Sequence, residues 1–152
     1  MTCPICETLA TVRASNEYIC ETEHWILKHA ARPYPAAGWL VLLSKRHVAG
    51  PAFFTEAEQA AIGPAISAVS RAIIDRTGAL RVYVASMNES SPHFHMHLVP
   101  RYEDGPTGWS VFAEQARAAA GDVLIKDAAI APIVRSLAVS LSSSNPQWVA
   151  RD

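Results

Sequence analysis

The side chains of this sequence that are best placed for chemistry lie in a short histidine-rich segment. Three of the six histidines of the chain, His93, His95 and His97, fall within five residues. Side chains alternate between the two faces of a strand. A strand here would therefore present all three imidazoles on one face, with neighbours about 6.5 Å apart. The residues between them are apolar and must cover a core, so the histidine face is directed at something else.

Three interpretations of this face are open. The first is a set of surface histidines on an amphipathic strand, for which repeated histidine has no structural advantage over lysine, threonine or glutamate. The second is a zinc site built from all three imidazoles. The third is phosphoryl chemistry, in which a neutral imidazole is the nucleophile and a neighbouring protonated one contacts a phosphoryl oxygen. Phosphoryl transfer depends mainly on positioning and charge stabilisation, which strand-mounted side chains supply, so we favour the third.

A second candidate site is the segment Cys3-Pro-Ile-Cys6 at the N-terminus. In a cytosolic protein, a Cys-x-x-Cys pair is typical of metal binding or redox activity. Redox motifs of the thioredoxin type follow a strand and open a helix in a βαβ unit. This pair has no such setting, which favours metal binding. The third cysteine, Cys20, lies in a predicted strand and fits a small buried hydrophobe.

The composition limits which classes of function are open. A chain of 152 residues, half of them hydrophobic and 18% charged, is sized for one domain with a real core. Its net charge of −1 excludes the strong basic excess that is typical of nucleic-acid-binding proteins, so a phosphate site must be local. The longest apolar run, Trp39–Leu43, is too short to cross a bilayer, and no signal peptide is evident. We expect a cytoplasmic protein without nucleic-acid or membrane partners.

The elements that must position these residues follow from turn signals and apolar spacing. Strands are predicted at residues 18–21, 25–29, 39–44, 80–87 and 93–101. Thr55-x-x-Glu58 is a capping box that opens a long helix. Pro64 inside it predicts a kink or a late helix start, and Gly78 is the expected C-terminal cap. An apolar stripe from Ile130 to Leu141 predicts a second helix near the C-terminus. Short connections favour antiparallel pairing, so we expect an α+β fold with a mostly antiparallel five-stranded sheet.

The histidine segment also carries a resemblance to a known family. His93–Val99 matches, at every position, the His-φ-His-φ-His-φ-φ signature (φ is apolar) of the histidine-triad (HIT) nucleotide hydrolases and transferases. Ala37–Val48 resembles the family's strand that enters a basic turn and a histidine, and Tyr18–His29 resembles its first hairpin. The resemblance covers residues 3–101. It implies a single HIT-like domain over 1–152, with a motif-bearing core at 1–101 and a divergent C-terminal segment at 102–152.

Carried over to this sequence, the resemblance implies an enzyme. His95 would attack the α-phosphorus of a nucleoside monophosphate anhydride or phosphoramidate and form a nucleotidyl-histidine intermediate, which water then hydrolyses. His97 would contact phosphoryl oxygens and assist the leaving group. Asn88 would contact phosphate or leaving group, or alternatively cap a turn. A different class of function also stays open, namely a non-catalytic nucleotide-binding or zinc-stabilised interaction module.

The resemblance further implies a structural zinc and a homodimer. Many bacterial members begin with Cys-x-x-Cys, and their two remaining zinc ligands resemble His47 and His93 here. With Cys3 and Cys6 these side chains would make a closed tetrahedral site. Family members usually dimerise through the long helix and the strand before the triad.

Two segments depart from the family pattern. The loop before the triad, Asn88–Pro92, lacks the usual Gly-Gln, so Ser90 or Ser91 is expected to take over the phosphate contact. Residues 28–32 offer no carboxylate or amide for ribose hydroxyls. Lys45 and Arg46 either draw in anionic substrates or form a solvated turn.

Overall fold

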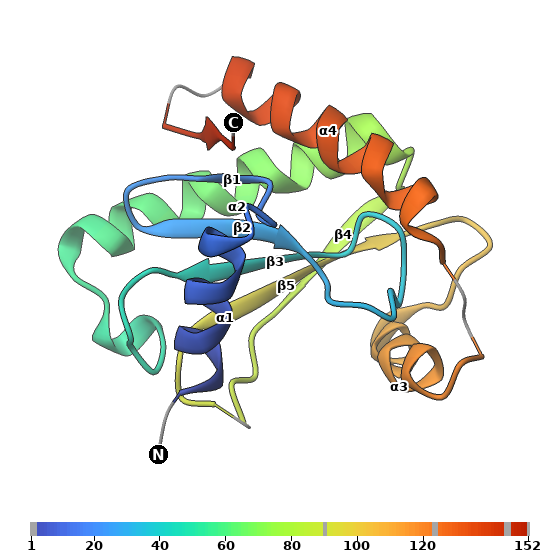
Figure 1. The fold of residues 1–152 in the computed structure, drawn as a ribbon, viewed down its shortest axis with the longest axis horizontal. Helices are drawn as coiled ribbons and strands as arrows, with labels where there is room; N and C mark the ends of the chain where they lie inside the picture. The colour runs from blue at the N-terminus through green and yellow to red at the C-terminus, as the bar shows by residue number, and fades with distance from the viewer. Residues whose placement is uncertain (1–2, 90, 123–124, 145–146, 152) are drawn as a thin grey trace.

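Residues 3–89, 91–122, 125–144 and 147–151 are described by the computed structural model. They form one antiparallel sheet with helices on both of its faces (Figure 1). Its strands are β1 Cys20–Glu21, β2 Trp25–His29, β3 Leu40–Ser44, β4 Arg81–Ala85, β5 His95–Arg101 and β6 Val149–Ala150. Their spatial order is β4-β5-β3-β2-β1-β6, and every neighbouring pair is antiparallel. The α+β prediction is confirmed, with six strands in place of five because β6 pairs with β1.

Four α-helices and two 3₁₀ turns accompany the sheet in the described part of the chain. They are α1 Pro4–Ala14, η1 Pro51–Phe53, α2 Glu56–Thr77, η2 Gly108–Phe112, α3 Ala113–Ala119 and α4 Asp127–Ser144. The long helix and the C-terminal helix were both predicted. Helices α1 and α3 were not, because each buries too few residues to give a periodic signal: Leu9 and Val12 in α1, and Ala118 in α3.

Helix α2 begins and ends as its capping residues predict, but Pro64 does not delay its start. The Thr55 hydroxyl accepts from the Glu58 amide at 3.2 Å, and the Glu58 carboxylate accepts from the Thr55 amide at 2.8 Å. Gly78 caps the other end with a left-handed φ of +71°. The expected late start is wrong, because the helix already runs from Glu56 through Pro64. Pro64 is exposed, so the carbonyl it leaves without an amide partner can bond to water.

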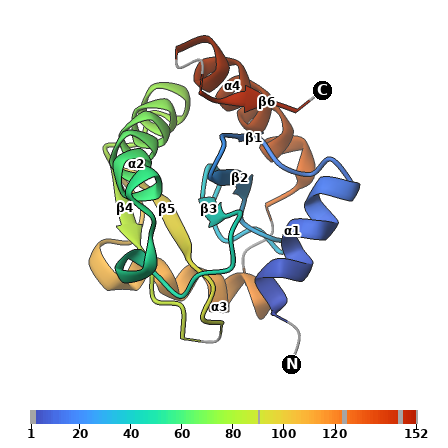
Figure 2. The same cartoon turned by 90° about the vertical axis from the view of Figure 1, so that its left-hand side faces the viewer.

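The sheet is covered on both faces, and this explains why its central strand is apolar throughout. Helices α2 and α4 pack on one face, where Leu27, Leu42 and Leu98 belong to the larger core. Helix α1 and η2 pack on the other, against a second cluster that contains Ile26 and Val41 (Figure 2). Every residue of β3 is buried, as its continuous apolar run predicts.

Strand β5 begins two residues later than predicted. The strand starts at His95, and His93 precedes it. The Phe94 amide donates to the Val48 carbonyl at 2.6 Å, and the Ser44 amide donates to the Phe94 carbonyl. The end of β3 and the turn after it thus hydrogen-bond to the backbone of Phe94, and β5 begins only at the next residue. His95 and His97 lie on the face that α1 and η2 cover, and His93 is directed elsewhere. Among the described residues, no helix has both the length and the apolar character needed to cross a membrane.

Candidate functional site

The first element of the site is His95, whose ring is oriented by the backbone that directly precedes its strand. Its Nδ1 lies 2.9 Å from the His93 carbonyl oxygen. A carbonyl only accepts hydrogen bonds, so Nδ1 carries the proton and donates it. In the neutral ring, Nε2 is then an unprotonated nitrogen with a lone pair. The His95 amide donates to the Asn88 side-chain oxygen at 3.2 Å, which fixes the backbone from which the half-buried imidazole projects.

The neighbouring His97 has the opposite arrangement of protons. The Trp39 indole Nε1 lies 3.0 Å from His97 Nδ1. An indole N–H can only donate, so Nδ1 accepts and the neutral ring carries its proton on Nε2. Burial lowers the pKa of His97 to about 4, and the positive charges of His95 and Lys28 add to this effect. The two imidazole centroids are 5.7 Å apart. Adjacent rings on one strand therefore present a bare nitrogen and an N–H.

Beyond the start of β5, two cysteines and two histidines converge. One ligand atom from each of Cys3, Cys6, His47 and His93 lies within 4.8 Å of the others. Sulfur-to-Nδ1 distances are 3.3 Å for Cys6 and His47, and 3.5 and 3.4 Å from His93 to Cys3 and Cys6. In a tetrahedral site with ordinary Zn–S and Zn–N bond lengths, such pairs lie about 3.5 Å apart. The cluster thus has the ligand types and spacing that zinc requires.

The outer contacts of this cluster also suit a metal. His93 is fully buried, and its Nε2 lies 2.8 Å from the Ser44 carbonyl oxygen. Nε2 must donate there, which leaves Nδ1 unprotonated and facing the sulfurs. Burial opposes ionisation of the Cys3 thiol, but hydrogen bonds from the Ser91 hydroxyl and the Cys6 backbone outweigh it and lower the Cys3 pKa to about 6. Burial and the neighbouring Cys3 raise the pKa of Cys6.

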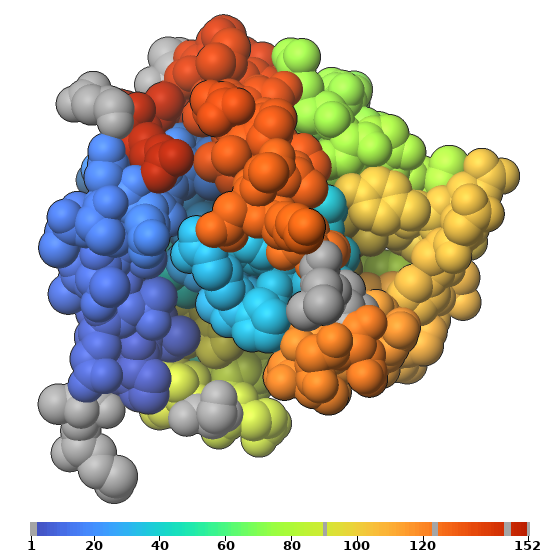
Figure 3. Space-filling model, turned by 45° about the vertical axis from the view of Figure 1, so that its right-hand side comes forward, coloured from blue at the N-terminus to red at the C-terminus, as the bar shows by residue number. Residues whose placement is uncertain are grey.

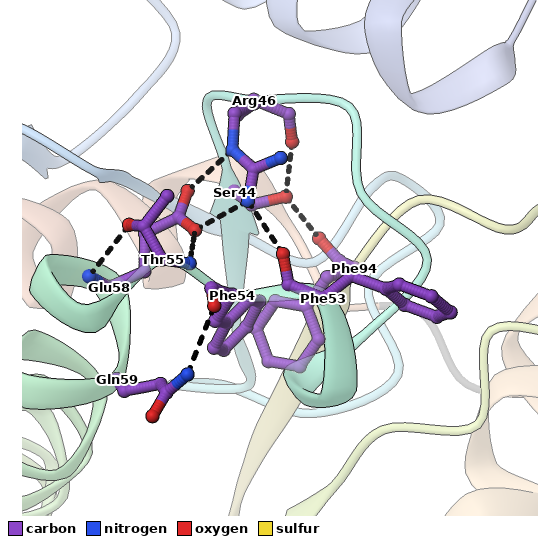
Figure 4. Close-up of polar contacts among 8 residues, drawn as sticks. All are labelled: Ser44, Arg46, Phe53, Phe54, Thr55, Glu58, Gln59 and Phe94. Atoms are coloured by element: carbon purple, nitrogen blue, oxygen red, sulfur yellow. Dashed lines mark hydrogen bonds and ion pairs between the residues drawn. The ribbon is translucent and has the colours of Figure 1, made fainter.

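The basic turn that carries His47 is joined to helix α2 by an ion pair between Arg46 and Glu58. Arg46 donates to both carboxylate oxygens of Glu58, at 3.0 and 2.6 Å, and to the Phe53 carbonyl (Figure 4). The hydrogen bonds from Arg46 lower the pKa of Glu58 to about 2, although burial opposes the shift. Lys45 pairs with Glu21 at 2.7 Å. Both cations are thus paired with carboxylates of the fold, so the turn is not merely solvated.

Of the residues expected to contact phosphate, Asn88 lies beside His95, whereas Ser91 lies beside the cysteines. Asn88 has a left-handed φ of 55°, and its side-chain amide donates to Ser86 and to the Ala49 carbonyl. It therefore ties the loop to β5 beside His95. Ser91 is buried, with its hydroxyl 3.5 Å from the Cys3 sulfur, so its placement favours the cysteine cluster over a substrate contact. Ser90 lies outside the described residues.

Sequence reasoning missed Trp39, which contacts the site, and also missed the buried His29, which lies on the other face of the sheet. His29 is buried, with Nδ1 3.1 Å from the Ala30 carbonyl and Nε2 accepting from the Gly38 amide at 3.0 Å. Burial lowers its pKa to about 4. His29 thereby closes the Pro-rich segment 30–38, seen in cyan between α4 and α3 in Figure 3. For Trp39, the sequence signal was its place at the start of a predicted buried strand. That signal does not identify its hydrogen-bond partner His97, which lies 58 residues further along the chain.

The comparisons with known proteins agree with this geometry. A Zn-bound histidine triad family protein from Mycobacterium smegmatis superposes with a TM-score of 0.66 over 92% of this chain and 97% of its own, at 17% identity. The chain has the histidine-triad fold. A hypothetical histidine triad nucleotide-binding protein from Sulfolobus tokodaii matches with a TM-score of 0.66 at 14% identity, covering 90% of this chain and 92% of that one.

A third solved structure of this fold is a Hit-like protein from Bartonella henselae, described as involved in cell-cycle regulation. It has a TM-score of 0.63 and 13% identity, and the match covers 88% of this chain and 94% of that one. No family model matches the sequence, and the search of curated proteins found no match. At these identities, the likeness shows that the triad is mounted on the histidine-triad fold.

Proposed function

We propose that this chain is a hydrolase or nucleotidyl transferase that acts on a nucleoside monophosphate anhydride or phosphoramidate through His95. The observation that supports this most directly is the hydrogen bond from His95 Nδ1 to the His93 carbonyl, because it leaves Nε2 as a free nucleophile. The histidine-triad fold and the nucleotide-binding description of one structural neighbour support a nucleotide as substrate.

The proposed reaction has two displacements at phosphorus. His95 Nε2 forms a bond to the α-phosphorus, and the bond to the leaving group breaks, with the electron pair departing on the leaving atom. The ring becomes a cation, and its Nδ1 proton stays hydrogen-bonded to the His93 carbonyl oxygen. A water molecule or an acceptor hydroxyl then attacks the phosphorus and releases its proton to solvent. The P–N bond breaks, and its electron pair returns to Nε2. His97 Nε2–H donates a hydrogen bond to the charge that develops on oxygen.

We propose zinc as the metal for Cys3, Cys6, His47 and His93. When bound there, the ion supplies a cross-link between the N-terminus, the basic turn and the first triad residue. The chain's own residues prepare the site, since the hydrogen bond from His93 to Ser44 presents the metal-binding nitrogen. Metal analysis of protein purified without chelators should give about one zinc per chain, and C3S/C6S should lose it.

Trapping the covalent intermediate tests the proposed activity. The protein is mixed with a radiolabelled dinucleoside polyphosphate or amine adenylate, quenched in alkali, and measured by intact mass. We expect a mass increase of one nucleotidyl group, located at His95 by peptide mapping. H95N should show neither adduct nor turnover.

The matched control is H24N, because His24 lies in the β1–β2 turn outside the site. It should retain both adduct and turnover. If the wild-type protein binds these nucleotides yet forms no adduct and releases no product, the enzymatic proposal is wrong and a nucleotide-binding module takes its place.

We also propose that a second copy of the chain packs against strand β4. This strand is the edge of the sheet in the described chain, and apolar side chains are exposed on and around it. They are Ile74, Leu80, Val84 and Met87, at 39%, 55%, 42% and 53% exposure. Light scattering should give a dimer mass, and V84E should shift it to the monomer. A monomer at all concentrations would refute this assignment.

A further inference from the structure

We propose that Trp39 restricts His97 to the role of a neutral hydrogen-bond donor, and that the site therefore cleaves phosphoanhydrides in preference to phosphoramidates. This inference rests on the proposed function at His95 and specifies its substrate class. Trp39 is a positioning residue, because it acts on the reaction through His97.

The contact between the two rings leaves only one choice of proton position. Trp39 Nε1 is 3.0 Å from His97 Nδ1, and the ring planes meet at 86°. The indole nitrogen has no lone pair to offer, so a proton on His97 Nδ1 would oppose the indole N–H. A doubly protonated His97 carries a proton on Nδ1, so it would place two N–H groups against each other. The contact therefore favours a His97 with one proton, on Nε2.

The indole cannot readily turn away from this contact. Trp39 is fully buried, in the core cluster formed with α1 and η2, and packs edge-on against Phe112 with ring centroids 5.8 Å apart. Its carbonyl accepts from the Ala30 amide at 2.8 Å, and its amide donates to the Ala36 carbonyl. Both ends of the residue are thus fixed, because its backbone closes the Pro-rich segment and its ring fills the core.

This restriction separates two classes of leaving group. In a phosphoanhydride, the bridging oxygen departs with its electron pair as a phosphate, whose second pKa is about 6, so it leaves as an anion and needs only a hydrogen bond. In a phosphoramidate, the departing nitrogen must gain a proton, because a simple amine has a pKa of about 10.4. A neutral His97 has one proton to give, and giving it would leave an imidazole anion. His97 therefore assists the first departure and does not supply the proton for the second.

The neighbouring charges act in the same direction. Attack by His95 makes its ring cationic, with its centroid 5.7 Å from that of His97. Lys28 lies on the same face two strands away, since it pairs with Val41, which in turn pairs with His97. A second positive charge on His97 at that stage would be repelled from both sides.

The experiment compares kcat/KM for a diadenosine polyphosphate and for the propylamine phosphoramidate of AMP. The wild-type protein should prefer the anhydride. W39F removes the N–H that opposes a proton on His97 Nδ1, so the ratio of anhydride to phosphoramidate should fall. Proton transfer to a leaving group contributes roughly 10²–10⁴-fold, and the fall should be smaller than this because burial and the charges of His95 and Lys28 remain.

Two further variants separate the lost N–H from the lost volume. Replacing Trp39 with benzothienylalanine puts sulfur in place of the N–H in a ring of nearly the same shape, and it should change the ratio as W39F does. The matched control is W25F, because Trp25 is equally buried and its Nε1 has no hydrogen-bond partner among the described residues. It should leave the ratio unchanged.

The ring nitrogens of His97 provide a readout that does not depend on activity. Long-range ¹H–¹⁵N spectra should show a proton on Nε2 and none on Nδ1 in the wild type, and a change in W39F. A protonated Nδ1 in the wild type, or an unchanged substrate ratio in both Trp39 variants, would overturn the proposal. If neither substrate turns over while the spectra match, the proposed function fails but the proton arrangement stands.

Discussion

The two ends of the histidine triad differ in what their ring nitrogens contact. At one end, His93 is fully buried with both nitrogens engaged, Nδ1 by the cysteine sulfurs and Nε2 by the Ser44 carbonyl. At the other, His97 is half-buried, and within the described part of the chain only its Nδ1 is engaged, by Trp39. The same residue type is thus suited to binding a metal at one end and to donating a hydrogen bond at the other. The role of each ring depends on which of its nitrogens is already held, Nε2 of His93 by the Ser44 carbonyl and Nδ1 of His97 by Trp39.

The largest expected effect concerns the buried end. H93A removes a proposed zinc ligand, opens a cavity and leaves the Ser44 carbonyl without its donor. We expect loss of zinc by metal analysis, and a fall in the free energy of unfolding of about 4 kcal/mol or more in urea titrations. A variant that retains stoichiometric zinc and near wild-type stability would show that the two ends do not differ in the way described.

H97A addresses the other end and should spare the metal. Removing one donor to developing negative charge typically lowers kcat by about 10²–10³-fold. Stability should fall by only about 1–3 kcal/mol, from the indole N–H left unpaired. Turnover assays with zinc analysis on the same preparation make the comparison. Zinc lost from H97A to the same extent as from H93A would contradict the separation.

His29 resembles His93 in being buried with both ring nitrogens engaged, but its partners are backbone groups, so its burial should appear as a pH dependence of stability. Its folded pKa of about 4 lies below the unfolded value of about 6.5, so the unfolded chain binds more protons between these limits. Stability should be complete above pH ~6.5 and fall by up to about 3 kcal/mol as the pH drops to ~4. Urea unfolding of wild type and H29L at pH 7 and pH 5 measures it. An equal pH effect in both proteins would exclude His29 as the source.

The smallest effect is expected at the basic turn that positions His47. The folded pKa of Glu58, about 2, lies below the unfolded value of about 4.3, so its pairing with Arg46 stabilises the fold above pH ~5 and is lost as the pH falls toward 2. E58Q should cost about 1–2 kcal/mol at pH 7, since Arg46 is half exposed to solvent. It should flatten the acid limb of the stability profile and weaken zinc retention against a chelator. Unaltered zinc retention would mean that the turn positions His47 without this ion pair.

The sequence carried most of the information about local structure. The capping box at Thr55, the cap at Gly78 and the buried strand β3 were predictable because each depends on residues close in the chain. The separation of His93 from the other two histidines was expected only from the resemblance. The structure gives the physical reason: the backbone of Phe94 is hydrogen-bonded to the turn after β3, so β5 begins at His95 and His93 lies outside the strand.

What could not be predicted depends on partners that are distant in sequence. The contact between Trp39 and His97 spans 58 residues, and either residue alone fits a generic core or site assignment. Strand β6 has two residues and exists through its pairing with Cys20 and Glu21. The ion pair between Arg32 and Asp127 likewise joins the Pro-rich segment to the divergent C-terminal region across 95 residues. No periodic pattern encodes such contacts.

The central claim is that the middle triad ring, His95, carries its proton on Nδ1, whereas the rings on either side of it carry theirs on Nε2. Long-range ¹H–¹⁵N spectra of histidine-labelled, zinc-loaded protein measure this directly for all three rings at neutral pH. We predict protons on Nε2 of His93, Nδ1 of His95 and Nε2 of His97. A proton on Nε2 of His95 in the neutral ring would remove the free nucleophile and contradict the account.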